Sequence, residues 1–345
     1  MSNNSNILLS CFKDKHSKEI PFWFMRQAGR YLPEYRAVRK NFSNFLEFCY
    51  KPEAACEVTL QPITRYGMSA AIIFSDILVI PDALGVDVKF VEGNGPVLVP
   101  VSDISELSKN NFREKLEPVY EAISLTRKSL PESTALIGFC GLPWTLACYM
   151  IEGKGSRDFQ SVRQTAFRKK EFFTKLIDIL TQSVIEHSLA QIKAGAQAIQ
   201  LFDSWAGVLS EQEFLDYSIT PSKKITAAIK EKYPSVPVIG FPRMAGSKVI
   251  DYAKNTGVDA VSFDGSISLQ IAKNELQKYV IAQGNLDSVL LAEDKNAACQ
   301  QVKKIIETLG DKSFVFNLAH GILPNTPVDN VAAICDIIKN NYVKS

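Results

Sequence analysis

The stretch Ala70-Ala-Ile-Ile-Phe-Ser-Asp76 decides the fold, because five apolar residues in succession end at a serine and a carboxylate. A short run without polar residues is typical of a strand that is buried on both faces, as in a parallel sheet. Six further runs of this kind follow along the chain. The seven predicted strands cover residues 70–74, 135–139, 198–202, 237–241, 259–263, 279–282 and 314–317.

Longer amphipathic segments separate these runs. Residues 170–195 carry apolar side chains at three- and four-residue steps and stop at a glycine, and residues 296–309 and 331–338 show the same pattern. Strands that alternate with helices predict an α/β fold, here a (β/α)8 barrel of the TIM type. Seven strands are one short of a closed barrel. We expect residues 22–25, or a strand within the long first intervals, to supply the eighth.

No Pro/Gly/Ser-rich linker, low-complexity tract or short repeat divides the 345 residues. We therefore expect one barrel domain over residues 21–345, preceded by an N-terminal arm over residues 1–20. A segment rich in Gly, Pro and Val at residues 93–101 predicts a hairpin inserted into the first long connection.

Composition argues against several classes of protein. With 39 basic and 37 acidic side chains, the net charge of +2 gives no overall field to attract nucleic acid or an anionic membrane. No segment approaches the roughly 18 apolar residues of a membrane span, and the N-terminus has no basic signal-peptide region. Seven cysteines without C-x-x-C spacing indicate free thiols in a reducing compartment. We expect a cytoplasmic protein without nucleic-acid or membrane partners.

Polar and glycine residues follow every predicted strand. The carboxyl ends of parallel barrel strands share one face, and that face carries the active site in TIM-type barrels. Polar strand ends that simply enter solvent are the alternative. The residues at these ends are Ser75, Asp76, Cys140, Gly141, Asp203, Ser204, Pro242, Arg243, Asp264, Gln283, Gly284, Asn285, Ala319, His320 and Gly321.

The densest group of chemically active residues lies at residues 21–39. Arg26 and Arg30 stand four residues apart around Gly29, within a segment rich in buried-type aromatic residues. Guanidinium groups bind carboxylates through two parallel hydrogen bonds, so the pattern indicates a ligand with several carboxylates. The alternative is a basic helix face that is solvated or paired with Glu34 and Glu47.

Two further polar residues are candidates for the same cavity. Asp76 ends the most apolar strand, where a carboxylate needs N–H donors or a positive charge to offset desolvation; a helix N-cap is the alternative. Tyr149 lies just over one turn into a helix predicted to begin near Pro143, and it either points into the barrel mouth or packs in the core.

The chain has only three histidines, and only His320 falls on the predicted rim. His16 lies in the arm and His187 in an amphipathic helix, where structural roles are favoured. Catalytic zinc usually takes three protein ligands, and Cys140 and Cys148 give only weak support for such a site. No dinucleotide motif, nucleophile elbow or strand-end lysine is present. We expect chemistry without a metal or a cofactor.

Several segments of the chain resemble the signatures of a known family, the uroporphyrinogen decarboxylases. Residues 21–35, PFWFMRQAGRYLPEY, are similar to its first signature, and residues 138–146, GFCGLPWTL, with Tyr149 and residues 152–153, are similar to its second. The resemblance extends in family order across nearly the whole chain, through residues 72–78, 200–207, 283–287 and 317–324.

This resemblance implies a homodimer that removes carbon dioxide from the four acetate groups of uroporphyrinogen III, giving coproporphyrinogen III without a metal or prosthetic group. It implies that Asp76, Arg26 and Tyr149 act in catalysis. It implies a substrate-binding set of Arg26, Gln27, Ala28 (through its backbone), Gly29, Arg30, Arg39, Asp76, Phe139, Tyr149, Phe202, Ser204 and His320.

The sequence departs from the family pattern at Ala319, at residues 262–265 and at residues 241–246, which leaves the role of Arg243 open. Two rival functions are kept. A zinc-dependent, corrinoid-linked thiol methyltransferase would need histidine and cysteine ligands at strand ends, and the H-x-C pair is absent. A non-catalytic tetrapyrrole-binding protein would not need Asp76 in a cleft for a polyanion.

Overall fold

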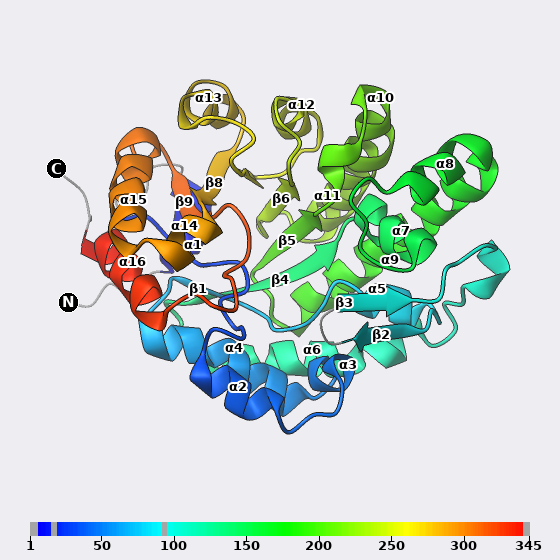
Figure 1. Ribbon diagram of the computed structural model, residues 1–345, viewed down its shortest axis with the longest axis horizontal. Helices are drawn as coiled ribbons and strands as arrows, with labels where there is room; N and C mark the ends of the chain where they lie inside the picture. Colours follow the sequence, from blue (N-terminus) through cyan, green and yellow to red (C-terminus); the bar gives the residue numbers. More distant parts are fainter. Residues whose placement is uncertain (1–5, 15–18, 92–94, 341–345) are drawn as a thin grey trace.

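Seven parallel strands form one sheet in the computed structural model, which describes residues 6–14, 19–91 and 95–340. Their order in space is β1-β4-β5-β6-β7-β8-β9, and helices surround them (Figure 1). All seven predicted strands are present. Their bounds are β1 Ala70–Ile72, β4 Ala135–Gly141, β5 Ala198–Asp203, β6 Val238–Pro242, β7 Ala260–Ser262, β8 Ile281–Leu286 and β9 Phe314–Leu318.

Phe22 fills the eighth position and closes the sheet. It forms a parallel bridge with Phe316 of β9, and its carbonyl accepts a hydrogen bond of 3.0 Å from the N–H of Ser69, directly before β1. The expected eighth strand is therefore reduced to one bridge. The chain leaves the extended conformation at Arg26, where φ is +59°.

Alternate residues of each strand face the barrel interior. In β4, Ala135, Ile137 and Phe139 contact the interior cluster, whereas Leu136 and Cys140 contact the layer beneath the helices. The interior-facing residues that begin β1, β4, β5 and β7 are all alanines. Small side chains at this level leave room for the indole of Trp23 and for the N-terminal helix.

Helices follow the strands in sequence as expected of βα units. The three predicted helices are confirmed in α9, α15 and α16, although α16 begins three residues before the predicted start. The helices that form the outer layer are α4 Pro52–Tyr66, α6 Phe112–Ser129, α9 Lys170–Ala194, α11 Thr220–Lys232, α12 Lys248–Asn255, α13 Leu269–Asn274, α15 Lys295–Leu309 and α16 Val328–Asn340. Shorter helices are α2 Pro33–Arg39, α3 Phe45–Cys49, α5 Val79–Ala83, α7 Pro143–Glu152, α8 Gln160–Arg168, α10 Glu211–Phe214 and α14 Ser288–Glu293.

The first long connection contains the expected hairpin, formed by β2 Val88–Val91 and β3 Gly95–Leu98. It begins upstream of the predicted segment, and residues 92–94 lie outside the described residues. Helix α1, Ile7–Asp14, closes the floor of the barrel, because Leu8 and Cys11 are fully buried in the interior cluster. His16 lies outside the described residues. None of the helices in the described ranges is long and apolar enough to cross a membrane.

Candidate active site

The predicted rim brings Asp76, Tyr149 and His320 together with Arg26. The charge of Arg26 lowers the pKa of each of the other three, which places the guanidinium within electrostatic reach of all of them. These four side chains come from segments that follow Phe22, β1, β4 and β9. They define the barrel mouth.

Arg26 is held in place at the mouth by its backbone and by Gly321. Its left-handed φ of +59° is costly for a residue with a side chain, and such strain is often found at functional sites. A Cβ atom on Gly321 would lie 2.6 Å from Arg26 Cγ and 2.9 Å from Arg26 Nε. The glycine therefore lets the arginine side chain lie directly over the backbone.

The alternative of a paired basic helix face is wrong for Arg26 and Arg30. Both precede α2, in a turn, and both side chains are exposed. Glu34 instead pairs with Arg65 at 2.7 Å, and Glu47 accepts from the Ser43 hydroxyl at 2.7 Å. Within the described ranges, neither Arg26 nor Arg30 forms an ion pair, so both charges are available to a ligand.

The backbone between these arginines adds two further donors. No acceptor in the described part of the chain reaches the N–H of Ala28 or Gly29. Gln27 is placed differently from the other predicted ligands, because its side chain is fully buried. Its amide accepts from Phe24 N–H at 3.0 Å and donates to the Ala70 carbonyl at 3.2 Å, which fixes the turn on β1.

Asp76 is half-buried at the end of β1 and serves two purposes. Its Oδ1 accepts a hydrogen bond of 2.8 Å from Leu78 N–H, so it does cap the turn that leads into α5. Burial raises the pKa of Asp76 to about 6, against the lowering effects of Leu78 N–H and of Arg26. Oδ2 receives no hydrogen bond from the residues that the structure describes. The ionised carboxylate is thus under-solvated and one oxygen can accept donors from a ligand.

Tyr149 lies within electrostatic reach of this carboxylate, and two phenylalanines pack at the barrel interior. Burial first, and then the charge of Asp76, raises the pKa of Tyr149 to about 12, so its hydroxyl remains a donor at neutral pH. Trp205 packs edge-on against Tyr149, with ring centroids 6.1 Å apart. The half-buried rings of Phe139 and Phe202 meet edge-to-face at 5.7 Å and form the apolar wall.

His320 is neutral in this environment. Burial is the main cause that lowers its pKa to about 4, and the charges of Arg26 and Arg243 lower it further. A neutral imidazole offers one N–H and one lone pair. Arg39 is half-buried and donates to the Phe42 carbonyl at 2.7 Å.

Some rim residues face away from the mouth. Cys140 lies 3.3 Å from the Ser188 hydroxyl of α9, on the helix side of β4, and so cannot act in the mouth. Asp203 also points outward, and accepts from the Thr145 hydroxyl at 2.7 Å and from the Ser218 hydroxyl at 2.6 Å. This alternation is visible in the sequence, since both residues are an odd number of positions from the inward alanine that begins their strand.

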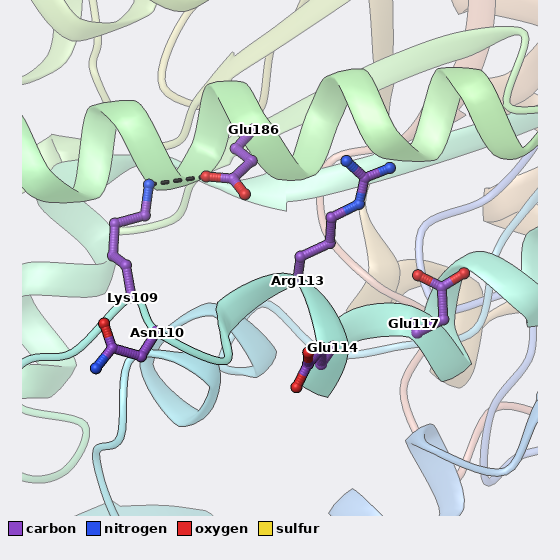
Figure 2. Close-up of a pocket in the computed structure, with 6 residues that line it drawn as sticks. All are labelled: Lys109, Asn110, Arg113, Glu114, Glu117 and Glu186. Carbon is purple, nitrogen blue, oxygen red and sulfur yellow. Dashed lines mark hydrogen bonds and ion pairs between the residues drawn. The ribbon is translucent and has the colours of Figure 1, made fainter.

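Among the residues that the structure describes, the other histidine, His187, has a structural partner. His187 is buried against the Tyr120 hydroxyl at 3.0 Å, and burial lowers its pKa to about 3. In the described ranges, no group of three His, Cys, Asp or Glu side chains is arranged to hold a metal ion. A groove of about 520 Å³ lies on the outer helix layer instead, between the start of α6 and α9, where Lys109 pairs with Glu186 at 2.8 Å (Figure 2). It contains none of the mouth residues.

Comparisons with known proteins point to one family. Residues 3–341 match the family model described as uroporphyrinogen decarboxylase (URO-D). A uroporphyrinogen decarboxylase from Rhodospirillum rubrum is 48% identical over 322 residues, which cover 92% of each chain. One from Mesorhizobium japonicum is 44% identical over 97% of this chain and 98% of its own. A methyltransferase from Methanosarcina mazei has the same fold, with a TM-score of 0.81 at 18% identity and 99% coverage of both chains.

Proposed function

The chain belongs to the uroporphyrinogen decarboxylase family, and from that premise we propose that its barrel mouth binds uroporphyrinogen III and converts the four acetate groups into methyl groups. The product is coproporphyrinogen III, as expected of an enzyme of porphyrin and haem synthesis. Each step releases one carbon dioxide and takes up one proton.

The single observation that carries this proposal is the under-solvated carboxylate of Asp76 in a mouth otherwise rich in arginine. A site that only bound a polyanion would be weakened by a negative charge. A carboxylate is useful there if positive charge develops beside it. Asp76 has a free oxygen for the pyrrole N–H groups of the substrate and a charge to stabilise a cationic ring.

The chemistry follows from the pyrrole ring itself. A proton added to the ring carbon next to the acetate makes the ring cationic. The bond between the acetate methylene and its carboxylate then breaks, and its electron pair neutralises the ring as carbon dioxide leaves. A second proton reaches the methylene carbon while the first returns to the medium, leaving a methyl group. The protonated ring accepts the electron pair, a role that a cofactor has in other decarboxylases. We therefore propose that no cofactor or metal takes part.

Arg26 and Tyr149 would act on the reacting acetate. Arg26 would grip the carboxylate and assist proton delivery, and the Tyr149 hydroxyl, a donor at neutral pH, would orient it together with Ser204. Gly321 would keep Arg26 in position.

The other carboxylates of the substrate would be held by Arg30, Arg39, the N–H groups of Ala28 and Gly29, and the neutral imidazole of His320. Phe139 and Phe202 would pack on the macrocycle. Arginine pairs with carboxylates more strongly than neutral donors do, which suits a substrate with many negative charges.

The rival methyltransferase function has support only at the level of fold, since the solved methyltransferase is 18% identical. A methyltransferase of this kind would need cysteine ligands, and the Cys140 thiol is instead hydrogen-bonded to Ser188 and Gln191 of helix α9. A decisive assay incubates the purified protein anaerobically with uroporphyrinogen III and separates the products by chromatography. We expect the hepta-, hexa- and pentacarboxylate intermediates and then the tetracarboxylate product. Unchanged substrate under conditions in which the protein is folded would contradict the proposal.

We further propose that the protein acts as a homodimer in the cytoplasm, with residues 1–20 as an arm on a barrel domain of residues 21–345. The family resemblance supports the dimer, and the seven free cysteines suit a reducing compartment. Met244 is a large apolar residue that is 53% exposed beside the mouth, where a second copy would cover it. Sedimentation velocity would show a species of twice the monomer mass.

A further inference from the structure

The position of Arg243 follows from the register of β5 and β6. Phe202 pairs with Phe241 and Asp203 with Pro242, and the ladder continues because Arg243 N–H donates to the Asp203 carbonyl at 3.1 Å. Ile239 and Phe241 face the barrel interior. Arg243 directly follows β6, and the alternation of side chains along the strand, continued by one residue, assigns it to the same face as these two, one step nearer the mouth.

Arg243 stands across the mouth from Arg26. Around the closed barrel, the segment of Phe22 is followed by β1, β4, β5 and then β6. In a ring of eight positions, the fifth is opposite the first. The two arginines follow these opposite positions, and both influence His320. A disc-shaped ligand that carries carboxylates around its whole edge would meet both.

The guanidinium of Arg243 has no counter-ion in the part of the chain that the structure describes. It is half-buried, and its one hydrogen bond to the described residues is a long one of 3.4 Å from Nη1 to the Ser204 carbonyl. The carboxylate of Asp264 is already used, since it accepts from Met244 N–H at 2.5 Å and from Ser266 N–H at 2.8 Å. A partly desolvated charge without a partner is unfavourable, so the site is complete only when an anion binds.

The chain is built to turn sharply immediately after Arg243. Met244 has a left-handed φ of +58°, which is strained for a side chain of this size. The Met244 N–H donates a hydrogen bond to the Asp264 carboxylate. Gly207 leaves room for the Met244 side chain, because a Cβ atom on Gly207 would lie 2.6 Å from Met244 Cβ. This arrangement, the Met244 turn, fixes the end of β6 and with it the direction of Arg243.

We propose that Arg243 is a substrate-binding residue that grips a carboxylate of the tetrapyrrole on the side of the mouth opposite Arg26, next to Ser204 and His320. This inference rests on the proposed function. Because Arg243 is far from Asp76 around the ring, its contact is made equally in the ground state and in the transition state. Its loss therefore raises KM more than it lowers kcat.

The test compares Arg243→Gln and Arg243→Lys with the wild type in the anaerobic uroporphyrinogen assay. A charge-assisted hydrogen bond to a carboxylate leads us to expect an increase in KM of about 10- to 100-fold for Arg243→Gln, with kcat within about 3-fold. Arg243→Lys should restore part of the lost affinity, since lysine keeps the positive charge but cannot form the two parallel hydrogen bonds of a guanidinium. The thermal midpoint of unfolding should not fall in Arg243→Gln, because a charge without a partner is removed.

Arg113→Gln is the matched control, because Arg113 is an exposed arginine on α6 in the groove of Figure 2. It should leave KM unchanged. An active wild type with an unchanged KM in Arg243→Gln would overturn this inference alone, and so would an equal change in Arg113→Gln. A wild type that is folded but inactive on uroporphyrinogen would overturn the proposed function, and this inference with it.

Discussion

At the scale of single residues, the charge of Asp76 should separate binding from catalysis. Asp76→Asn keeps the shape of the side chain and an acceptor for Leu78 N–H, but removes the negative charge. We expect turnover of uroporphyrinogen to fall by about 10² to 10³, the usual cost of losing one preorganised electrostatic group, while substrate binding persists. Single-turnover kinetics with a binding titration would measure both. Asp178→Asn, an exposed change on α9, is the control and should be silent; a near-normal rate in Asp76→Asn would leave Asp76 with only its capping role.

The same residue predicts how stability depends on pH. The pKa of Asp76 is about 6 in the folded protein and 3.8 in its ordinary state, so between these values the native state binds more protons than the unfolded state. The free energy of unfolding therefore falls as pH rises through this window. Because the side chain is only half-buried, we expect Asp76 to contribute a decrease of roughly 1 to 2 kcal/mol between about pH 4 and pH 7.

Urea unfolding of the wild type and of Asp76→Asn at both pH values isolates this contribution. The variant should gain stability relative to the wild type as pH rises, because it lacks the titrating group. Asp203, whose pKa is also raised to about 6, is present in both proteins and cancels. The difference in free energy of unfolding between Asp76→Asn and the wild type could instead stay constant, or shift in favour of the wild type, as pH rises. Either result would show that the Asp76 carboxylate is not destabilised by burial.

Gly321 should be required for the placement of Arg26. In Gly321→Ala the new methyl group would overlap Arg26 Cγ, so the arginine has to leave its position against Gly321. We expect kcat/KM to fall at least about 10-fold with little loss of stability, because a side chain moves and the backbone does not. Gly265→Ala is the control, since a Cβ there meets nothing within 4 Å. Normal activity in Gly321→Ala would show that the orientation of Arg26 is not critical.

At the scale of elements, α7 carries Tyr149 to the mouth and is fixed by Thr145, one turn earlier on the same face. The Thr145 hydroxyl donates to Asp203 at 2.7 Å and accepts from Trp205 N–H at 3.3 Å. Thr145→Val keeps the shape and removes both hydrogen bonds, so that buried Asp203 retains the Ser218 hydroxyl but loses the Thr145 hydroxyl; we expect a loss of about 1 to 3 kcal/mol in the free energy of unfolding. Chemical denaturation would measure it. Thr181→Val, which removes only a bond to the preceding turn of α9, should cost less.

At the scale of the whole molecule, α1 completes the barrel. Leu8 is fully buried among interior residues, and the alanines that begin four strands leave space for it. Leu8→Ala should lower the free energy of unfolding by about 2 to 4 kcal/mol, since a cavity would remain in the barrel floor. Leu215→Ala, at a leucine that is 45% exposed, should change it by less than about 0.5 kcal/mol. Equal effects in the two variants would mean that α1 does not seal the floor.

The sequence by itself determined the seven strands and their parallel direction, because both depend on short apolar runs that alternate with amphipathic helices. It also contained the evidence that Cys140 and Asp203 face the helices, through the two-residue alternation of a strand. The family signatures identified the chemistry.

The tertiary structure alone decided the features that join distant parts of the chain. Phe22 closes the barrel on Phe316, Gly321 makes room for Arg26, and burial, helped by the charges of two arginines, keeps His320 neutral. The Met244 turn directs Arg243 in the same way, through Gly207 and Asp264. The physical reason is that steric clearance, desolvation and electrostatic fields act through space, so they depend on which residues folding brings together and not on their spacing in the sequence.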